Sequence, residues 1–379
     1  MTPKIAEFLR RHQDETPFLV VDLDKVRENF LELRRALPLA EIYYAVKANP
    51  AAPVLDQLVG LDSRFDAASA EEVELCLAAG ADPARISYGN TVKKARDIRR
   101  AHEAGVRLFA FDSAAELDKL ADEAQGARVF CRILTDNAGA DWPLSRKFGC
   151  ELEMARDLML AAAAKGLEPH GISFHVGSQQ TDPAQWDIAI GRAAMVFTDL
   201  RRAGVEVEML NLGGGFPARY RGGDVPPIED FADAIMKSMT RHFGNHLPAM
   251  IIEPGRCIAA EAGVLQTEVV LVSRKSYDAS EPRWVYLDVG KFGGLAETMD
   301  EAIRYPIDTP YGEAAETGEV IIAGPTCDGA DILYETSGYR LPLALKAGDK
   351  VRLLSAGAYT APYASQGFDG FAPMREHYI

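Results

Sequence analysis

The chain has 379 residues, of which 47% are hydrophobic and 26% charged, and this composition favours a soluble globular protein of two domains over a disordered one. Its 56 acidic against 41 basic residues argue against nucleic-acid binding. No apolar stretch is long enough for a membrane span, and the charged segment from Met1 to Glu15 lacks a secretory signal. We therefore expect a cytoplasmic protein without membrane or nucleic-acid partners.

Strand and helix patterns alternate through the first two thirds of the chain. Apolar or β-branched runs predict eight strands, at Glu41–Lys47, Phe65–Ser69, Arg85–Asn90, Leu108–Ser113, Arg128–Ile133, His170–Gly177, Met209–Gly215 and Ala249–Gly255. The segments between them are amphipathic. Eight repeats of strand and helix are typical of a (β/α)₈ barrel, which carries its active site at the carboxyl ends of the strands.

Two of the predicted helices have clear start signals. Ser69 and Glu72, and likewise Ser113 and Glu116, have the spacing of a capping box. The helices that they open should end near Gly80 and Gly126, since glycine commonly follows a helix.

The pattern changes after about residue 262. Strands are predicted at Val264–Val272, Trp284–Val289, Val320–Ala323 and Val351–Ala356, with few long helices between them. We therefore predict an α/β fold with a barrel domain at residues 22–262 and a C-terminal β domain, a sandwich or small barrel, at residues 263–379. Residues 1–21, with a strand at Phe18–Asp22, are expected to join the C-terminal domain.

The five cysteines are Cys76, Cys131, Cys150, Cys257 and Cys327, and they form no C-x-x-C pair. We therefore expect neither a disulfide framework nor a metal site.

Lys47 ends the first predicted strand, in the segment Tyr43-Tyr44-Ala45-Val46-Lys47-Ala48-Asn49. A lysine at this end of a barrel strand faces the mouth of the active site, where partial burial would lower its pKa and make its amine a nucleophile for a Schiff base. The alternative is an ordinary solvated lysine at a strand end.

The seventh and eighth strands favour the functional reading of Lys47. The seventh runs into Gly213, Gly214 and Gly215, and the eighth into Glu253-Pro254-Gly255-Arg256. Consecutive glycines let backbone N–H groups approach an anion, and the loops after these two strands commonly bind phosphate in (β/α)₈ enzymes. Arg256 can add a charge-assisted contact. A tight turn would explain the glycines equally well if they stood alone.

Two further residues fit a flat, phosphorylated cofactor. His175 and Ser178 follow the sixth strand, where the imidazole can stack on a ring and the hydroxyl can contact a phosphate. Glu253 can face a pyridine nitrogen and keep it protonated, which makes such a cofactor a strong electron sink. The alternatives are a core histidine, a capping serine and an exposed ion pair.

Six motifs, in order along nearly the whole chain, resemble the fold-type III pyridoxal-phosphate-dependent decarboxylases, most closely ornithine or lysine/ornithine decarboxylase. The motifs begin at Val46, His175, Gly213, Glu253, Pro325 and Gly357, and read VKAN, HVGS, GGGFP, EPGR, PTCDG and GAYT. The resemblance implies that Lys47 holds pyridoxal phosphate, that His175 stacks on its ring and that Glu253 binds its pyridine nitrogen. It also implies that the phosphate is held by Ser178, the glycines 213–215, Gly255, Arg256 and Tyr359.

The resemblance also assigns residues around the cofactor. Asp66, Glu72 and Arg132 match the polar shell near Lys47. Cys327 and Asp328 would enter the site from the second subunit of a homodimer, with Cys327 as the proton donor after decarboxylation. Phe368 matches an aromatic residue of the substrate pocket.

The same resemblance bears on the substrate. Ornithine decarboxylases bind the distal ammonium with acidic residues, which here would be Asp328 and Asp300. The segment before Asp300 is one residue shorter than in the family and carries Met299 where tyrosine is common, so Glu297 is an alternative to Asp300. We expect ornithine to be converted to putrescine, with lysine as a possible second substrate because it differs by one methylene.

Two other decarboxylases and an inactive relative are alternatives within this family, and Glu253 argues against a fourth, alanine racemase. Diaminopimelate decarboxylases carry a basic segment where this chain is acidic, arginine decarboxylase shares the cofactor motifs, and alanine racemase places arginine where this chain has Glu253. A catalytically inactive relative, like the antizyme inhibitors, would have lost cofactor residues. This chain retains Lys47, His175, Glu253 and Cys327, which favours an enzyme.

Overall fold

A computed structural model of residues 1–379 describes the chain except for residues 13, 136–137, 143–146, 279 and 313. The described chain divides into two compact units. The sheet unit comprises Met1–Val26, Ala218–Asp224 and Ile258–Ile379, and the barrel unit comprises Arg27–Pro217 and Val225–Cys257. The short segment Ala218–Asp224 thus belongs to the sheet unit although its neighbours along the chain belong to the barrel unit.

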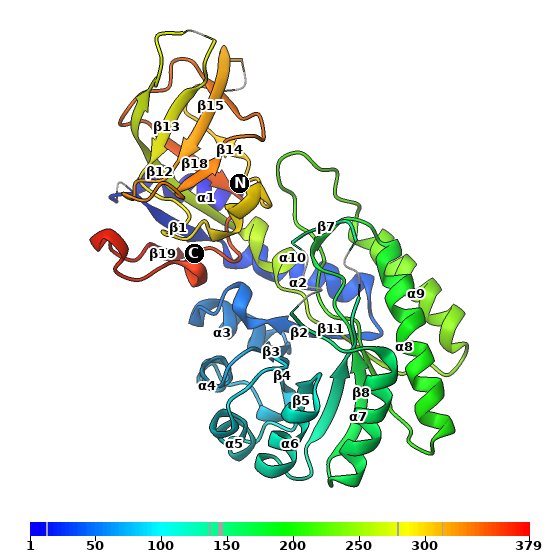
Figure 1. The fold of residues 1–379 in the computed structure, drawn as a ribbon. Coiled ribbons are helices and arrows are strands. Elements are labelled where there is room, and N and C mark those ends of the chain that lie inside the picture. The colour runs from blue at the N-terminus through cyan, green and yellow to red at the C-terminus, as the bar shows by residue number, and fades with distance from the viewer. Residues whose placement is uncertain (13, 136–137, 143–146, 279, 313) are drawn as a thin grey trace. The chain divides into compact units, whose positions relative to one another are not determined.

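The barrel unit contains a closed barrel of parallel strands (Figure 1). In sequence order the strands are β2 (Ala40–Ala45), β3 (Arg64–Ala67), β4 (Ile86–Tyr88), β5 (Leu108–Phe111), β6 (Arg128–Arg132), β8 (Glu168–Ser173), β10 (Met209–Asn211) and β11 (Ala249–Ile252). The parallel pairing of β11 with β2 closes the barrel. All eight predicted strands are confirmed, and the structure ends each of them one to four residues earlier than the sequence pattern indicated. The residues beyond those ends form the loops that carry the polar side chains.

Helices lie outside the barrel strands (Figure 1). They are α2 (Leu23–Ala36), which begins in the sheet unit, α3 (Ala52–Gly60), α4 (Ala70–Ala78), α5 (Ala95–Glu103), α6 (Ala114–Glu123), α7 (Leu152–Ala164), α8 (Ala184–Arg202) and α9 (Ile228–Phe243). The hydroxyls of Ser69 and Ser113 cap α4 and α6 by accepting hydrogen bonds from the N–H groups of Glu72 and Glu116. The two predicted helix starts are therefore confirmed.

The interior of the barrel is filled by side chains, so the barrel is a packed core and not a pore. A buried cluster of Tyr43, Leu108, Ala110, Phe130, Met209 and Ile251 brings together residues from five strands. Gly171 of β8 is required by the close approach of β10, because a Cβ at this position would lie 2.3 Å from the carbonyl oxygen of Met209.

The sheet unit is built on a mixed sheet in the order β14-β18-β12-β13-β15-β16. These strands are β12 (Gly263–Ser273), β13 (Arg283–Leu287), β14 (Ile307–Asp308), β15 (Thr317–Ala323), β16 (Ile332–Tyr334) and β18 (Lys350–Leu354), with β17 (Arg340–Pro342) beside β15. The four strands predicted after residue 262 correspond to β12, β13, β15 and β18.

The N-terminus completes this sheet. Strand β1 (Phe18–Val21) pairs antiparallel with β12 and parallel with β19 (Arg375–Tyr378). Helix α1 (Pro3–Arg11), which the sequence analysis did not predict, begins at the N-cap Thr2 and buries Ile5 and Leu9 against Phe18, Val20 and Val264.

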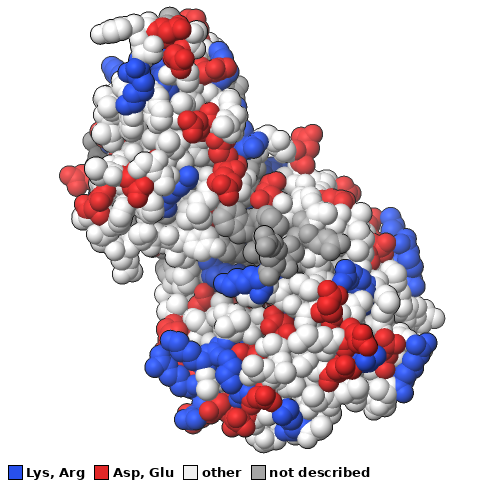
Figure 2. Space-filling view, viewed as in Figure 1, with Lys and Arg blue, Asp and Glu red and all other residues white. Residues whose placement is uncertain are grey.

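Acidic and basic side chains are interspersed over the visible face of the molecule (Figure 2). Among the helices that the structure describes, none combines the length and the apolar character needed to cross a membrane.

Candidate functional site

Lys47 lies just beyond β2, in the short 3-10 helix Val46–Ala48. The strand prediction was wrong here by two residues, because β2 ends at Ala45. About half of the Lys47 side chain (49%) is exposed, and its Nζ lies 3.5 Å from Oδ2 of Asp66. The amine is therefore accessible and stands beside a carboxylate.

Asp66 belongs to β3 and is buried. Its burial raises the pKa of the carboxyl group, while Lys47 and Arg132 oppose that rise. Gly89 packs directly on it, since a Cβ at position 89 would lie 1.9 Å from Oδ1 of Asp66. Glu72 lies nearby on α4, where its Oε2 accepts a hydrogen bond of 2.7 Å from the N–H of Ala68 and thereby holds the loop after β3.

Arg132, at the end of β6, and Glu253 belong to the same cluster. Burial lowers the pKa of Arg132, and Glu253 and Asp112 favour its charged form. Glu253 follows β11, and one of its oxygens accepts a hydrogen bond from the side-chain amide of Asn211. Burial and the nearby Asp66 raise the pKa of Glu253 to about 7. This carboxyl group can hold or release a proton near neutral pH.

His175 follows β8, and its environment determines both its charge and its tautomer. Burial lowers its pKa well below the ordinary value, and Arg132 and Lys47 add to this effect. The imidazole is therefore neutral at neutral pH. Its Nδ1 accepts a hydrogen bond of 3.0 Å from the N–H of Gly177, so the proton is on Nε2.

The three glycines after β10 are required by close packing. A Cβ at Gly213, Gly214 or Gly215 would lie 2.2–2.5 Å from a backbone carbonyl oxygen of a neighbouring loop. Gly213 and Gly215 also have positive φ angles of 66° and 106°, which favour glycine. The N–H of Gly213 donates to Oδ1 of Asn211 at 2.9 Å. The backbone donor at position 213 is thus already used within the protein.

Arg256 and Ser178 form a hydrogen-bonded pair next to these glycines. Arg256 is buried, follows the buried Gly255 and opens the short helix α10 (Arg256–Ala259). Its Nε and Nη2 donate to the Ser178 hydroxyl at 3.3 and 3.0 Å. A guanidinium next to a hydroxyl provides the charge and the geometry for a phosphate.

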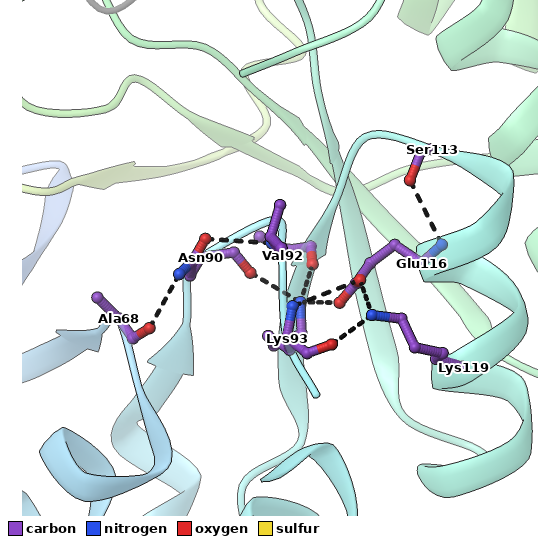
Figure 3. Close-up of polar contacts among 8 residues, drawn as sticks. Ala68, Asn90, Val92, Lys93, Ser113, Glu116 and Lys119 are labelled. Atoms are coloured by element: carbon purple, nitrogen blue, oxygen red, sulfur yellow. Dashed lines mark hydrogen bonds and ion pairs between the residues drawn. The ribbon is translucent and has the colours of Figure 1, made fainter. Parts of the chain in front are cut away.

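A second lysine cluster lies at the carboxyl ends of β4 and β5 (Figure 3). Nζ of Lys93 donates to the carbonyl oxygens of Asn90 and Ala110 at 2.7 and 2.6 Å, and lies 3.0 Å from Oε1 of Glu116. The side chain of Lys93 is fully buried. Asn90 in turn donates to the carbonyl oxygen of Ala68 at 3.1 Å, so the cluster joins the end of β4 to the loop after β3.

Cys327 and Asp328 lie on an exposed loop of the sheet unit between β15 and β16. Buried Asp331, which the sequence analysis did not single out, holds this loop. Its Oδ2 accepts from the hydroxyl of Thr326 at 2.7 Å, and its Oδ1 accepts from the N–H of Lys291 at 2.7 Å. The signal in the sequence that could have identified Asp331 is its position at the end of the segment Pro325–Asp331.

The Phe368 segment meets the Cys327 loop. Oδ2 of Asp369 accepts a hydrogen bond of 2.7 Å from the N–H of Cys327. The ring of Phe368 lies 4.7 Å from that of Phe292, and both rings line a cavity of about 340 Å³ within the sheet unit. The structure thus brings together two of the segments that the sequence analysis assigned to the substrate pocket.

The remaining predicted residues lie on turns of the sheet unit. Asp300 is exposed, whereas Glu297 is buried with only 2% of its surface accessible, so Asp300 is the better placed of the two to meet a ligand. Tyr359 is buried and has a positive φ of 55°. The ring of Tyr363 is its aromatic neighbour at 6.1 Å.

The side chains of the barrel unit fit a phosphorylated aromatic aldehyde. Each part of such a cofactor has a partner among them. The partners are the accessible amine of Lys47, the carboxyl group of Glu253 with its pKa near neutrality, the neutral imidazole of His175, and the pair of Arg256 and Ser178. The interactions that shift these pKa values place Lys47, Asp66, Arg132, His175 and Glu253 in one electrostatic cluster.

Comparison with known proteins points to the same kind of cofactor. Residues 23–260 match the family described as pyridoxal-dependent decarboxylase, pyridoxal binding domain. The lysine/ornithine decarboxylase of Selenomonas ruminantium is 38% identical over 356 residues, which cover 94% of this chain and 88% of that protein. A crystal structure of the Selenomonas lysine decarboxylase with pyridoxal phosphate and cadaverine has a TM-score of 0.88 and 36% identity, with 100% of this chain and 94% of that chain covered.

The Paramecium bursaria Chlorella virus arginine decarboxylase bound to agmatine has a TM-score of 0.89 and 27% identity over the whole of both chains. Three observations lead to one conclusion. The family match spans the barrel, the relatives are similar over nearly the full length, and the polar side chains of the barrel unit suit the cofactor. The chain belongs to the pyridoxal-phosphate-dependent decarboxylases with a (β/α)₈ barrel, the fold-type III family.

Proposed function

We propose that the protein decarboxylates L-ornithine to putrescine, with lysine as a second substrate that yields cadaverine, and that it thereby supplies polyamine biosynthesis. The observation that carries this proposal is the pair of exposed carboxylates, Asp300 and Asp328, on turns of a pyridoxal-phosphate decarboxylase. A distal ammonium needs such anionic partners, and a distal carboxylate would be repelled by them.

The barrel unit would bind the cofactor. Lys47 would attach it through the accessible amine, and Asp66, with Arg132, would keep that amine positioned. Arg256, Ser178, Gly214, Gly215 and Gly255 would hold the phosphate, with Gly213 shaping the loop through its bond to Asn211. His175 would lie against the ring as a neutral imidazole.

Glu253 would set the electronic character of the cofactor. Bound pyridoxal phosphate supplies an electron sink for the electron pair that remains when the α-carboxylate leaves as CO₂. With a pKa of about 7, Glu253 can place a proton at the pyridine nitrogen and balance the resulting positive charge. Asn211 fixes the orientation of this carboxyl group.

Cys327 would return a proton to the α-carbon, and Asp328, Asp300 and Phe368 would recognise the rest of the substrate. The family resemblance supports a homodimer in which the Cys327 loop of one subunit serves the barrel of the other. Such a C2 dimer has two equivalent mixed sites.

Mixing variants tests this shared site. Lys47→Ala and Cys327→Ala dimers should each be nearly inactive. After free subunit exchange, about half of the dimers are heterodimers with one intact site, so activity should recover to roughly one quarter of wild type. If exchange is demonstrated independently and activity does not recover, each site is built within one chain.

Product analysis tests the substrate. Ornithine, lysine, arginine and diaminopimelate should be offered side by side to the holoenzyme, with the released amines identified. Putrescine should form fastest and cadaverine more slowly. Agmatine as the main product, or lysine formed from diaminopimelate, would identify one of the other family activities. An absence of cofactor absorbance after reconstitution would instead indicate an inactive, antizyme-inhibitor-like protein.

Variants at the two candidate acids refine the assignment. Asp300→Ala should weaken use of ornithine and lysine by about 1.5–3 kcal/mol, the value of a charge-assisted hydrogen bond, and leave cofactor binding unchanged. If Asp300→Ala were normal and Glu297→Ala impaired, Glu297 would be the substrate residue.

A further inference from the structure

Two consecutive residues in the turn that carries Asp300 have left-handed backbone. Asp300 has φ 51° and Glu301 has φ 54°, within the short helical segment Ala296–Glu301. Residues with a Cβ adopt this conformation at an energetic cost, and they keep it only where the surrounding structure imposes it. Contacts outside the turn must therefore hold these two residues.

Glu301 makes such contacts. Its Oε1 accepts hydrogen bonds from the N–H groups of Glu335 and Thr336 at 2.7 and 2.6 Å. Partial burial opposes ionisation of this carboxyl group, but the backbone donors of Thr336 and Glu335, together with the hydroxyls of Ser337 and Thr336, outweigh it and lower its pKa to about 2. Glu301 is therefore a carboxylate at all ordinary pH values, and charge-assisted bonds of this kind are stronger than neutral ones.

The residues on either side of the turn are fixed as well. The hydroxyl of Tyr334 accepts from the N–H of Tyr305 and donates to the carbonyl oxygen of Ile303, both at 2.9 Å. The N–H of Ile303 donates to the carbonyl oxygen of buried Glu297 at 3.0 Å. Between these fixed points only Met299 and Asp300 are exposed.

We propose that Glu301 is a positioning residue for substrate selection, which clamps the turn to the segment after β16 (Ile332–Tyr334) and so fixes the place of the Asp300 carboxylate. The inference rests on the proposed role of Asp300. A fixed carboxylate distinguishes two diamines that differ by one methylene, whereas a carboxylate on a loosened turn adapts to both. Glu301 thus sets the ratio of ornithine to lysine use without touching either substrate.

The test uses the holoenzyme and measures equilibrium binding of putrescine and cadaverine by calorimetry. Glu301→Ala should weaken binding of the preferred diamine by about tenfold or more, the loss expected when one charge-assisted hydrogen bond is no longer well placed. Its affinities for the two diamines should converge, as should kcat/KM for ornithine and lysine. Affinity for pyridoxal phosphate should stay at the wild-type value.

Two matched variants separate the anchor from backbone strain. Glu301→Gln keeps an Oε1 acceptor for both N–H groups and should retain most of the affinity and selectivity. Glu301→Gly accepts the positive φ without strain but removes the anchor, so it should behave like Glu301→Ala. Wild-type selectivity in Glu301→Gly would overturn the inference, and melting temperatures of all variants would identify any that fail to fold.

A double variant tests whether Glu301 acts through Asp300. In an Asp300→Asn background, Glu301→Ala should cause little further loss of diamine binding. Equal losses in both backgrounds would overturn the inference, as would a normal Glu301→Ala beside an impaired Asp300→Asn. A normal Asp300→Asn would remove both the role of Asp300 and the inference. If the wild type bound neither diamine and produced none, the proposed function itself would be wrong.

Discussion

Two lysines follow strands of the barrel and lie beside carboxylates, yet only one of them is suited to react. Lys47 is half exposed, and the carboxylate of Asp66 lies 3.5 Å from its Nζ. Lys93 is fully buried, and its Nζ contacts two carbonyl oxygens and Glu116. Burial lowers the pKa of Lys93 to about 8, which by itself would suggest a nucleophile.

The comparison shows that a lowered pKa does not make a lysine reactive when no substrate can reach it. The hydrogen bonds of Lys93 instead tie the ends of β4 and β5 together, and through Asn90 they support the loop that follows Asp66 (Figure 3). We therefore expect Lys47 to supply the chemistry and Lys93 to stabilise the loops around it.

The largest effect is expected at Lys47. Lys47→Ala should reduce turnover by orders of magnitude, because no amine remains to attach the cofactor. Lys47→Arg should be equally inactive although it preserves a cation beside Asp66, and this pair of variants separates attachment from electrostatics. Decarboxylation assays with each variant provide the measurement, and substantial activity in Lys47→Arg would contradict the assignment.

A smaller loss is expected at Glu253. Glu253→Gln keeps an acceptor for Asn211 but removes the carboxylate that we propose as the anionic partner of the pyridine nitrogen. The rate of CO₂ release should fall by about 10²–10³, the usual effect of removing one electrostatic partner from a transition state, while cofactor affinity changes little. Single-turnover CO₂ release and a cofactor titration measure the two quantities, and an unchanged rate would mean that Glu253 does not face the ring.

Lys93 should affect stability and not chemistry. Lys93→Met leaves Glu116 with Lys119 as its cationic partner and deprives the carbonyl oxygens of Asn90 and Ala110 of their donor. Each buried acceptor left unpaired costs about 1–3 kcal/mol of unfolding free energy. Urea denaturation measures this loss. Exposed Lys94 is the matched control, and Lys94→Met should change the free energy of unfolding by less than about 0.5 kcal/mol. Equal stability of the two variants would show that the Lys93 cluster contributes nothing to the free energy of unfolding.

The pH dependence of stability gives the smallest signal. The pKa of Lys93 is about 8 in the folded protein against an ordinary value of 10.5. Between these values the unfolded chain binds a proton that the folded protein has lost, so this residue makes stability rise as pH increases from about 8 to 10.5. Lys93→Met should lack this contribution, and the difference in unfolding free energy between the two proteins should therefore widen over that range.

The sequence was sufficient for the barrel because its strands are apolar runs separated by amphipathic helices, two of which begin at a capping serine. All eight strands and the starts of α4 and α6 follow from local patterns. The residues that hold the site together were less accessible to such reasoning. Asn211, Asp331, Asp369 and Glu301 act through contacts with residues distant in the sequence, and no local pattern indicates those contacts.

Glu116 also shows that a local sequence pattern does not reveal the contacts of a side chain with distant residues. Its capping-box spacing correctly predicted the start of α6, but its side chain forms ion pairs with Lys93 and Lys119. The left-handed backbone of Asp300 and Glu301 was also unexpected, since neither residue is glycine and the hydrogen bonds to Glu301 come from residues more than 30 positions later in the chain.

The distinction between the two lysines can be tested most directly by chemical trapping. The holoenzyme should be reduced with borohydride, digested and mapped by mass spectrometry, which locates a reduced pyridoxyl group on one lysine. We predict that Lys47 carries the label and that Lys93 remains unmodified. A label on Lys93, or on any lysine other than Lys47, would contradict the assignment of the cofactor site.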